Sequence, residues 1–524
     1  MCCGETDLSF VLSMVRMTIF HNFTGYALDA VGSRITALAV ADGRIVAAGS
    51  ESFVRETLRS FAAEATRIDL GGRTVVPGLI DAHNHLVQYG IEATRSADLT
   101  GCKSISEMLD RLRSFRAAHP DLPWLLGRRF DQELFAEGRW PTRQDLDTIG
   151  SDIPIMVSRV CLHAIVANSA ALAPLRNRLG ADQLKTGLLT EDAADALWRL
   201  IPSPSLHDVK RAALWAMKEA RRAGLTGVHC IVSGVEELEA IRALHDEGSL
   251  PIRLTLQCPY GMMDRLVSDG LKTGSGNEKL KIGALKVFMD GSLGARTAAL
   301  KLPYADDPEN SGVPFRNERD LAALLREMQA HGFQAAIHAI GDLAVECAAS
   351  GIESAMRFGN QGNRLRHRIE HASIMSPRLV AEIARLGVPV CVQPQFIITD
   401  FWTPRRVGPE RYRWAYPFKT MLDAGIVLAM GSDCPVERLD AVELIGRAVN
   451  REPHSSAERL TVEQTLRAYS FGSAYAGFGE QVLGSLEVGK LADFTVFAPD
   501  VLEADPSEIG GARVEATFVG GQVE

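Results

Sequence analysis

Short apolar runs alternate with helical stretches through most of this chain. Eight of the runs are rich in small and branched apolar residues and end in polar or glycine-containing segments, as expected for buried strands. Repeated strand and helix units of this kind predict an α/β fold, a TIM (β/α)8 barrel, with functional residues at the carboxyl ends of the strands. The predicted strands are 75–83, 225–231, 252–258, 282–290, 333–341, 367–372, 388–394 and 426–433.

Both ends of the chain show a different pattern, in which short β-rich runs are separated by glycine and proline. Residues 34–50 contain an Asp-Gly pair between two such runs, which is typical of a hairpin. Residues 484–500 and 513–524 repeat the β-rich pattern near the C-terminus. The predicted domains are therefore a small β-sandwich built from 17–76 and 472–524 and a metal-dependent hydrolase barrel of 77–471.

A long segment separates the first two predicted strands. It spans about 130 residues, far more than the few residues of an ordinary βα loop. We therefore expect an inserted subdomain after the first strand, at about 95–222, and we expect it to cover the mouth of the barrel.

Composition limits the classes of partner. The 524 residues are 46% hydrophobic and 23% charged, which is ordinary for a globular protein. The net charge of -9 and the absence of any Lys/Arg-rich run argue against nucleic-acid binding. No apolar stretch approaches the roughly 18–20 residues of a membrane span. We expect a small-molecule substrate and no nucleic-acid or membrane partner, and we leave a homodimer open.

The N-terminus and the cysteines bear on cellular location. No basic leader precedes the first apolar residues, so we expect a cytoplasmic protein without a secretory signal. The nine cysteines are scattered, apart from Cys2 and Cys3, which favours reduced thiols over a disulfide framework. Residues before Met17 are expected to be a loose extension, and the true start is left open among Met1, Met14 and Met17.

Ionisable residues occur at the ends of five of the predicted strands. Taken singly, a histidine in an apolar run is more often a packed core residue, a lone lysine usually reaches out to solvent, and an aspartate in a turn usually caps a helix. Taken together, their shared position at one pole of the barrel is hard to explain by chance. The residues are His83, His85, Lys286, His338, His371 and Asp433.

These residue types suit a metal site. His83 and His85 are two apart, so in a strand both side chains lie on one face. Neutral imidazoles and a carboxylate suit Zn²⁺ and similar divalent ions, and two such ions can stabilise a developing oxyanion. A buried lysine such as Lys286 has a depressed pKa and is nucleophilic, so it can capture CO₂ as a carbamate that bridges two metals.

Several motifs together resemble the amidohydrolase superfamily, and more narrowly its YtcJ-like branch, amidohydrolase family 3, which includes N-substituted formamide deformylase. The resemblance runs from about residue 38 to the C-terminus. Its motifs are PGLIDAHNH at 77–85, LKVFMDGSLGARTA at 285–298, IHAIGD at 337–342, RIEHA at 368–372, AYPFKTMLDAGI at 415–426, LAMGSDCPV at 428–436, AYSFGSAYA at 468–476 and GSLEVGKLADFTVF at 484–497.

This resemblance implies a fold, a ligand set and a reaction. The reaction would be hydrolysis of a C–N bond other than a peptide bond, in an amide or N-substituted formamide, by a metal-activated hydroxide. Asp433 would act as general base and then as general acid toward the leaving nitrogen. The cofactor would be one or two divalent ions per chain, with zinc favoured. His83, His85 and Asp433 would hold one metal, His338 and His371 the other, and Lys286, carboxylated, would bridge them.

Further residues have weaker assignments. By resemblance, His163 reaches over the site to the substrate carbonyl, although a packed core histidine is an equal alternative. Asp290 would orient a ligand or substrate, with a turn-forming aspartate slightly favoured instead. Arg413 and Tyr416 line a pocket or merely pack, and His229 ends the second predicted strand without an assigned role.

The chain also departs from the family pattern around the predicted pocket. Cys230 follows His229 where many relatives have aspartate, Cys434 replaces a frequent tryptophan, and Phe130 stands where tryptophan is usual. Because these positions lie outside the ligand set, they affect the expected substrate rather than the expected reaction.

Two other functions compete with amide hydrolysis. A deaminase on the same barrel normally uses one metal and a glutamate shortly after the fifth-strand histidine, whereas Gly341 and Asp342 occur here. A non-catalytic scaffold would be expected to lose ligands, and none is missing from the sequence.

Overall fold

The computed structural model describes residues 17–59, 65–159, 164–358, 362–451 and 456–523. It divides into two compact units, residues 1–86 with 214–524, and residues 87–213. The predicted extension before Met17 lies outside the described residues. This division does not test the domain boundaries expected from the sequence, which stay predictions.

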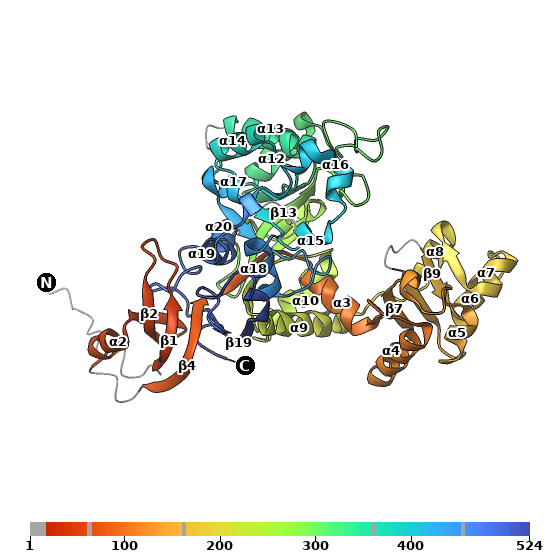
Figure 1. Ribbon diagram of the computed structural model, residues 1–524, viewed down its shortest axis with the longest axis horizontal. Coiled ribbons are helices and arrows are strands. Elements are labelled where there is room, and N and C mark those ends of the chain that lie inside the picture. The colour runs from red at the N-terminus through yellow and green to blue at the C-terminus, as the bar shows by residue number, and fades with distance from the viewer. Residues whose placement is uncertain (1–16, 60–64, 160–163, 359–361, 452–455, 524) are drawn as a thin grey trace. The chain divides into compact units, whose positions relative to one another are not determined.

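The larger unit contains a parallel sheet of eight strands in sequential order, from the first strand to the last. This sheet and the helices between its strands confirm the TIM-like barrel (Figure 1). Every predicted strand run overlaps one of them. The strands are β5 (Leu79–Asn84), β11 (Leu225–Ile231), β12 (Arg253–Pro259), β13 (Leu280–Phe288), β14 (Gln334–Ala339), β15 (Arg368–His371), β16 (Val390–Val392) and β17 (Leu428–Met430).

Helices follow the barrel strands, and α12, α13 and α14 lie side by side (Figure 1). Helix α14 shows how the sequence sets a boundary: Ser376 caps its N-terminus, Pro377 opens it, and Gly387 ends it with a positive φ of 62°. The helices of this unit are α2 (Glu51–Thr57), α9 (Leu206–Arg222, which begins in the smaller unit), α10 (Val235–Asp246), α11 (Met263–Ser268), α12 (Glu318–Ala330), α13 (Asp342–Arg357), α14 (Pro377–Leu386), α15 (Phe396–Thr399), α16 (Thr403–Tyr412), α17 (Phe418–Asp423), α18 (Ala441–Val449), α19 (Val462–Arg467) and α20 (Ser473–Ala476).

Buried hydrogen bonds join the first barrel strand to the last. The backbone N–H of Asp433 donates to the His83 carbonyl at 2.8 Å, and that of His85 donates to the Cys434 carbonyl at 2.8 Å. The buried carboxylate of Asp81 accepts the Ser432 hydroxyl at 2.6 Å. These bonds hold the ends of β5 and β17 together, although these two strands are not paired by a ladder of backbone hydrogen bonds.

The run TVVPGLIDAH is two strands rather than one. Strand β4 (Thr66–Pro77) belongs to a second sheet, and β5 starts at Leu79 in the barrel. Gly78 lies between them, and a Cβ at this position would lie 2.2 Å from Oγ1 of Thr226. A side chain is therefore excluded where the chain passes from one sheet to the other.

The two chain ends form one mixed six-stranded sheet, in the order β19-β18-β4-β1-β2-β3. The predicted hairpin is confirmed as β2 and β3, joined through Asp42 and Gly43, both with positive φ. The sandwich form expected for this domain is not confirmed, because the strands form a single sheet. Its remaining strands are β1 (Met17–Tyr26), β2 (Arg34–Ala41), β3 (Arg44–Gly49), β18 (Phe494–Ala498) and β19 (Arg513–Phe518).

Aromatic packing ties the two ends of the chain within this sheet. The ring of Phe20 from β1 lies 5.0 Å from that of Phe494 and 5.1 Å from that of Phe518. All three side chains are buried in one apolar cluster, so the C-terminal strands supply part of the core that the N-terminal strands need.

The smaller unit has its own five-stranded sheet, in the order β10-β9-β8-β7-β6, and its own apolar clusters. It occupies most of the range in which an inserted subdomain was expected. Its elements are α3 (Leu86–Arg95, whose first residue belongs to the larger unit), β6 (Ser96–Asp98), α4 (Ile105–Ala118), β7 (Leu125–Phe130), α5 (Arg143–Asp147), β8 (Ile155–Arg159), β9 (Ala164–Ala167), α6 (Ser169–Leu172), α7 (Ala181–Thr186), β10 (Leu188–Thr190) and α8 (Glu191–Trp198).

Two expectations from composition can be compared with the described residues. No helix among them is both long and apolar enough to cross a membrane. Within the described residues no disulfide includes Cys102, Cys230, Cys258, Cys347, Cys391 or Cys434.

The junction between the first and last barrel strands yields a prediction about stability. Replacing Asp81 with Ala leaves Ser432 and Asn84 without their buried acceptor, so we expect the free energy of unfolding to fall by roughly 2–4 kcal/mol. Urea unfolding followed by circular dichroism measures this. Glu309→Ala, which removes an exposed carboxylate, is the matched control and should leave the midpoint unchanged. Equal midpoints for the two variants would contradict the role of Asp81.

Candidate metal centre

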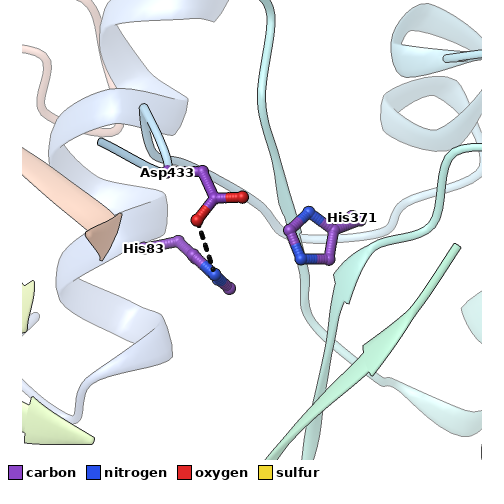
Figure 2. Close-up of side chains that lie close together, drawn as sticks. All are labelled: His83, His371 and Asp433. Carbon is purple, nitrogen blue, oxygen red and sulfur yellow. Dashed lines mark ion pairs between the residues drawn. The ribbon is translucent and has the colours of Figure 1, made fainter. Parts of the chain in front are cut away.

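Three predicted ligands meet at the carboxyl end of the barrel: His83 at the end of β5, His371 at the end of β15 and Asp433 just after β17. One ligand atom from each lies within 4.8 Å of the others, and all three side chains are buried. In Figure 2 the Asp433 carboxylate points toward His83, and the His371 ring lies to the right of both side chains. The distance from His83 Nε2 to Asp433 Oδ1 is 3.3 Å.

The other predicted ligands border this cluster. His85 Nε2 lies 3.3 Å from the same Asp433 oxygen. Lys286 Nζ lies 3.2 Å from His83 Nε2, deep in the barrel. The ring centroid of His338 lies 4.5 Å from that of His371. All six residues proposed from sequence therefore lie close together. Three of them, His83, His371 and Asp433, form the group whose ligand atoms all lie within 4.8 Å of one another.

Local backbone conformation places two of these side chains. His371 has a φ of 72° and Asp433 a φ of 57°, which few residues other than glycine adopt. In a regular strand, His371 would point away from the side chain of the preceding residue, Glu370. The left-handed conformation ends the alternation, so Glu370 and His371 both lie close to His83.

Burial favours the uncharged form of three of the nitrogen ligands, whereas for His83 the carboxylates of Asp433 and Glu370 outweigh burial and raise the pKa. Removal from water lowers the pKa of His338 to about 3 and that of His371 well below its usual value. Burial likewise lowers the pKa of the Lys286 amine. For Asp433, burial alone would raise the pKa, but the neighbouring His83 outweighs it and holds the pKa well below its usual range. His338 and His371 thus present imidazole lone pairs beside an ionised carboxylate.

A second group of residues holds the ring nitrogens that face away from the cluster. His83 Nδ1 makes a short contact with Glu370 Oε2, and His371 Nδ1 lies 2.8 Å from Gln393 Oε1. His338 Nε2 lies 2.9 Å from the Gly291 carbonyl oxygen. Sequence reasoning missed Glu370 and Gln393. The one available signal was the pair Arg368 and Glu370, two charged residues on one face of an otherwise apolar strand.

Asp290 serves the backbone of the strand ends. Its carboxylate accepts hydrogen bonds from the N–H groups of Ala299 at 2.9 Å, Ile340 at 3.0 Å and Gly341 at 2.8 Å. Its Oδ1 lies 3.6 Å from His338 Nε2. Three amide donors share its two oxygens, so Asp290 anchors the loop beside His338, and a role in orienting a ligand or substrate stays a prediction.

The remaining candidates are placed as follows. His163 lies outside the described residues. His229 is buried and contacts Arg368 rather than the cluster. The Tyr416 hydroxyl donates to Asp400 at 2.5 Å, and Arg413 is paired with Glu410.

The three departures from the family pattern are all buried. They are Phe130 in the smaller unit, and Cys230 and Cys434 in the larger.

The donor set fits a divalent transition metal. Imidazole nitrogens and carboxylate oxygens bind zinc at roughly 2.0–2.2 Å, so atoms held within 4.8 Å of one another can share one ion. The outer partners of His83, His371 and His338 are of the kind that orient metal-binding histidines. These residues support a divalent metal at this site.

Known proteins resemble this chain over most of its length. A family model described as "Amidohydrolase family" matches residues 66–523. The putative amidohydrolase YtcJ of Bacillus subtilis (strain 168) is 32% identical over 531 residues, spanning 96% of this chain and 98% of that protein. N-substituted formamide deformylase of Arthrobacter pascens is 27% identical over 549 residues, spanning 97% of this chain and 98% of that protein.

A solved structure is similar over the same extent. The crystal structure of an uncharacterized metal-dependent hydrolase from Pyrococcus furiosus matches with a TM-score of 0.80 and 32% identity, covering 94% of this chain and 99% of that chain. The similarity in sequence and in structure therefore extends over nearly the whole chain.

Proposed function

The chain belongs to the amidohydrolase family, and from that premise we propose that it hydrolyses a C–N bond in a small amide or N-substituted formamide. The family and the hydrolases among its relatives support a metal-dependent hydrolytic function. The proposal lies in the bond and the substrate class. The observation that carries it is the buried cluster of His83, His371 and Asp433 at the carboxyl end of the barrel.

The ligand roles that we propose are those that the family resemblance implies. His83, His85 and Asp433 would hold one ion, which we propose to be zinc. His338 and His371 would hold a second. Such ions, when bound, polarise a carbonyl and lower the pKa of a water molecule. The chain itself supplies neutral imidazoles, because burial keeps His338 and His371 unprotonated.

Lys286 is proposed to bridge the two positions as a carbamate. Burial lowers the pKa of its amine, and a neutral amine attacks CO₂, forming an N–C bond and releasing one proton. The modification replaces a basic amine by an anion. An anion suits a position 3.2 Å from a proposed ligand nitrogen of His83 better than an ammonium group.

Asp433 is proposed to move the proton of the reaction. Its carboxylate is ionised and lies against His83 and His85, so it can accept a proton from the attacking water. The same carboxyl group then donates this proton to the leaving nitrogen, which departs as a neutral amine. One residue thus acts first as base and then as acid.

A deaminase remains the alternative activity. Asp342, which follows the fifth-strand histidine where a deaminase has glutamate, accepts the backbone N–H of Lys301 at 3.0 Å and starts helix α13. Its carboxylate therefore already has a structural role at the start of this helix. Together with the buried Lys286, this favours hydrolysis. Ammonia release from an aminated heterocycle without turnover of any amide would reverse the assignment.

Elemental analysis and a substrate screen test the proposed function together. We expect near two zinc-like ions per chain, a carbamate on the Lys286 peptide, and turnover of at least one N-substituted amide or formamide that stops when the metal is removed by a chelator. Protein grown with added zinc and manganese that holds no metal would favour a non-catalytic scaffold.

Asp433→Asn tests the acid and base roles. We expect the fold and much of the metal to remain, while kcat falls by roughly 10²–10⁴ because the amide accepts no proton at neutral pH. Asp440→Asn, which changes the cap of α18 a few residues further on, is the control and should retain near-normal turnover. Near-normal activity of Asp433→Asn would refute the role.

Lys286→Ala tests the bridge. We expect fewer ions per chain, and partial recovery on addition of a short carboxylate such as formate or acetate, which can occupy the vacated space. Lys281→Ala removes a part-buried lysine of the same strand, whose amine donates to the Gly477 carbonyl at 2.6 Å away from the cluster. This control should keep its metal, and unchanged metal content in Lys286→Ala would exclude a bridging lysine.

A further inference from the structure

A chain of buried polar contacts leads from His83 into the interior of the barrel. The Nδ1 atom of His83 contacts Oε2 of Glu370, and Oε1 of Glu370 accepts a hydrogen bond from Nε of Arg368 at 2.6 Å. Arg368 in turn donates to the Ala82 carbonyl at 2.9 Å and lies 2.9 Å from Nδ1 of His229. Glu370 and Arg368 are no more than 1% exposed.

The donors and acceptors in this chain determine where the protons are. A guanidinium group only donates, so the Glu370 oxygen that faces Arg368 accepts. Paired in this way, Glu370 is a carboxylate, and its second oxygen can only accept as well. His83 must therefore carry its hydrogen on Nδ1. When the ring is neutral, its Nε2 presents a lone pair toward the side where Asp433 and Lys286 lie.

We propose that Glu370, held by Arg368, is a positioning residue that fixes His83 in the tautomer able to bind metal through Nε2. The inference rests on the proposed function, because it takes His83 as a ligand. Carboxylates that accept from the outer nitrogen of a ligand histidine orient the ring and raise its basicity, and their loss typically weakens metal binding by about 10–100-fold.

A different use of Glu370 can be set aside. Ligand atoms of His83, Glu370 and Cys391 also lie within 4.8 Å of one another and form a second geometric cluster. A cation in that position would have to share Glu370 with the guanidinium of Arg368. Like charges at such a distance in a buried site repel strongly, so Glu370 supports His83 rather than binding a metal.

His371 shows the same arrangement with a neutral partner. Its Nδ1 lies 2.8 Å from Oε1 of Gln393, which leaves its Nε2 free. Among the described residues no arginine donates to the amide oxygen of Gln393, and its own nitrogen faces Cys391 Sγ at 3.9 Å. An amide oxygen can therefore accept the Nδ1 hydrogen of a ligand histidine when no other donor competes for that oxygen. At Glu370, Arg368 donates to one oxygen, so a carboxylate with two accepting oxygens is needed to serve both Arg368 and His83.

Glu370→Gln tests the proposal. The single amide oxygen is drawn to Nε of Arg368, so the amide nitrogen faces His83 and makes Nδ1 the acceptor. The His83 hydrogen then moves to Nε2 and blocks the metal-binding atom. We expect the affinity of the apo-protein for zinc alone, measured by competition with a chromophoric chelator, to fall by roughly 10–100-fold, with the circular dichroism spectrum unchanged.

Asp493→Asn is the matched control. Asp493 is a buried carboxylate that accepts from Arg253 at 2.6 and 2.9 Å, and it contacts none of the predicted ligands among the described residues. Its substitution perturbs a similar buried ion pair, yet the zinc affinity should match that of the wild type. An equal loss in both variants, or wild-type affinity in Glu370→Gln, would overturn the positioning role.

The double variant Arg368→Met with Glu370→Gln separates tautomer selection from the loss of charge. Without the guanidinium, the amide oxygen can turn to His83 and restore the hydrogen on Nδ1, so zinc should bind more tightly than to Glu370→Gln. No recovery in a folded protein would overturn tautomer selection. If Glu370→Gln fails to fold, the double variant carries the test, because it leaves no unpaired buried charge. Affinity within about tenfold of wild type then supports the proposal, and a larger loss overturns it.

The wild type distinguishes this proposal from the proposed function. A wild-type protein that binds no zinc is a failure of the proposed function, whereas tight binding that Glu370→Gln leaves unchanged is a failure of the Glu370 inference alone.

Discussion

The site depends on the meeting of the first and last barrel strands. Asp433 donates its backbone N–H to the His83 carbonyl, and Asp81 on β5 accepts from Ser432 just after β17. These bonds join residues about 350 positions apart in the chain. Because His83 and Asp433 are themselves members of the candidate metal cluster, the bonds that close the barrel also assemble the site. A loss of closure would separate ligands as well as strands.

The interior of this barrel is unusually polar, and that polarity has a cost. A TIM barrel is ordinarily filled with branched apolar side chains, whereas Arg368, Glu370 and His229 are buried between the candidate site and the carbonyl of Ala476. Burying an ion pair stabilises a fold little or not at all relative to apolar packing. The arrangement is therefore better explained by what it does for His83 than by stability, since it fixes one ring nitrogen from a rigid base.

The sequence was sufficient to predict the barrel strands and to select six residues that lie close together, because each signal is local. An apolar run and the residue at its end can be read without knowledge of the fold. The sequence was insufficient to predict the roles of Glu370 and Asp81. Apart from Arg368, the partners on which these roles depend lie far away in the chain. The sequence also hid the change of sheet at Gly78, since an apolar run looks the same whether one strand or two pass through it. The positive φ of His371, which places that ring beside His83, has no signature in RIEHA.

The outer partners of the proposed ligands differ in charge, and that difference bears on how the two metal positions behave. His83 is supported by an ionised Glu370, His371 by the neutral amide of Gln393 and His338 by the carbonyl of Gly291. A carboxylate raises the basicity of the histidine it contacts more than a neutral oxygen does. Under the proposed ligand roles, the position held by His83 would therefore be the stronger one, and the position held by His338 and His371 would depend more on Lys286. An anionic carbamate at Lys286 would supply that second position with the charge that its histidines do not receive from their outer partners.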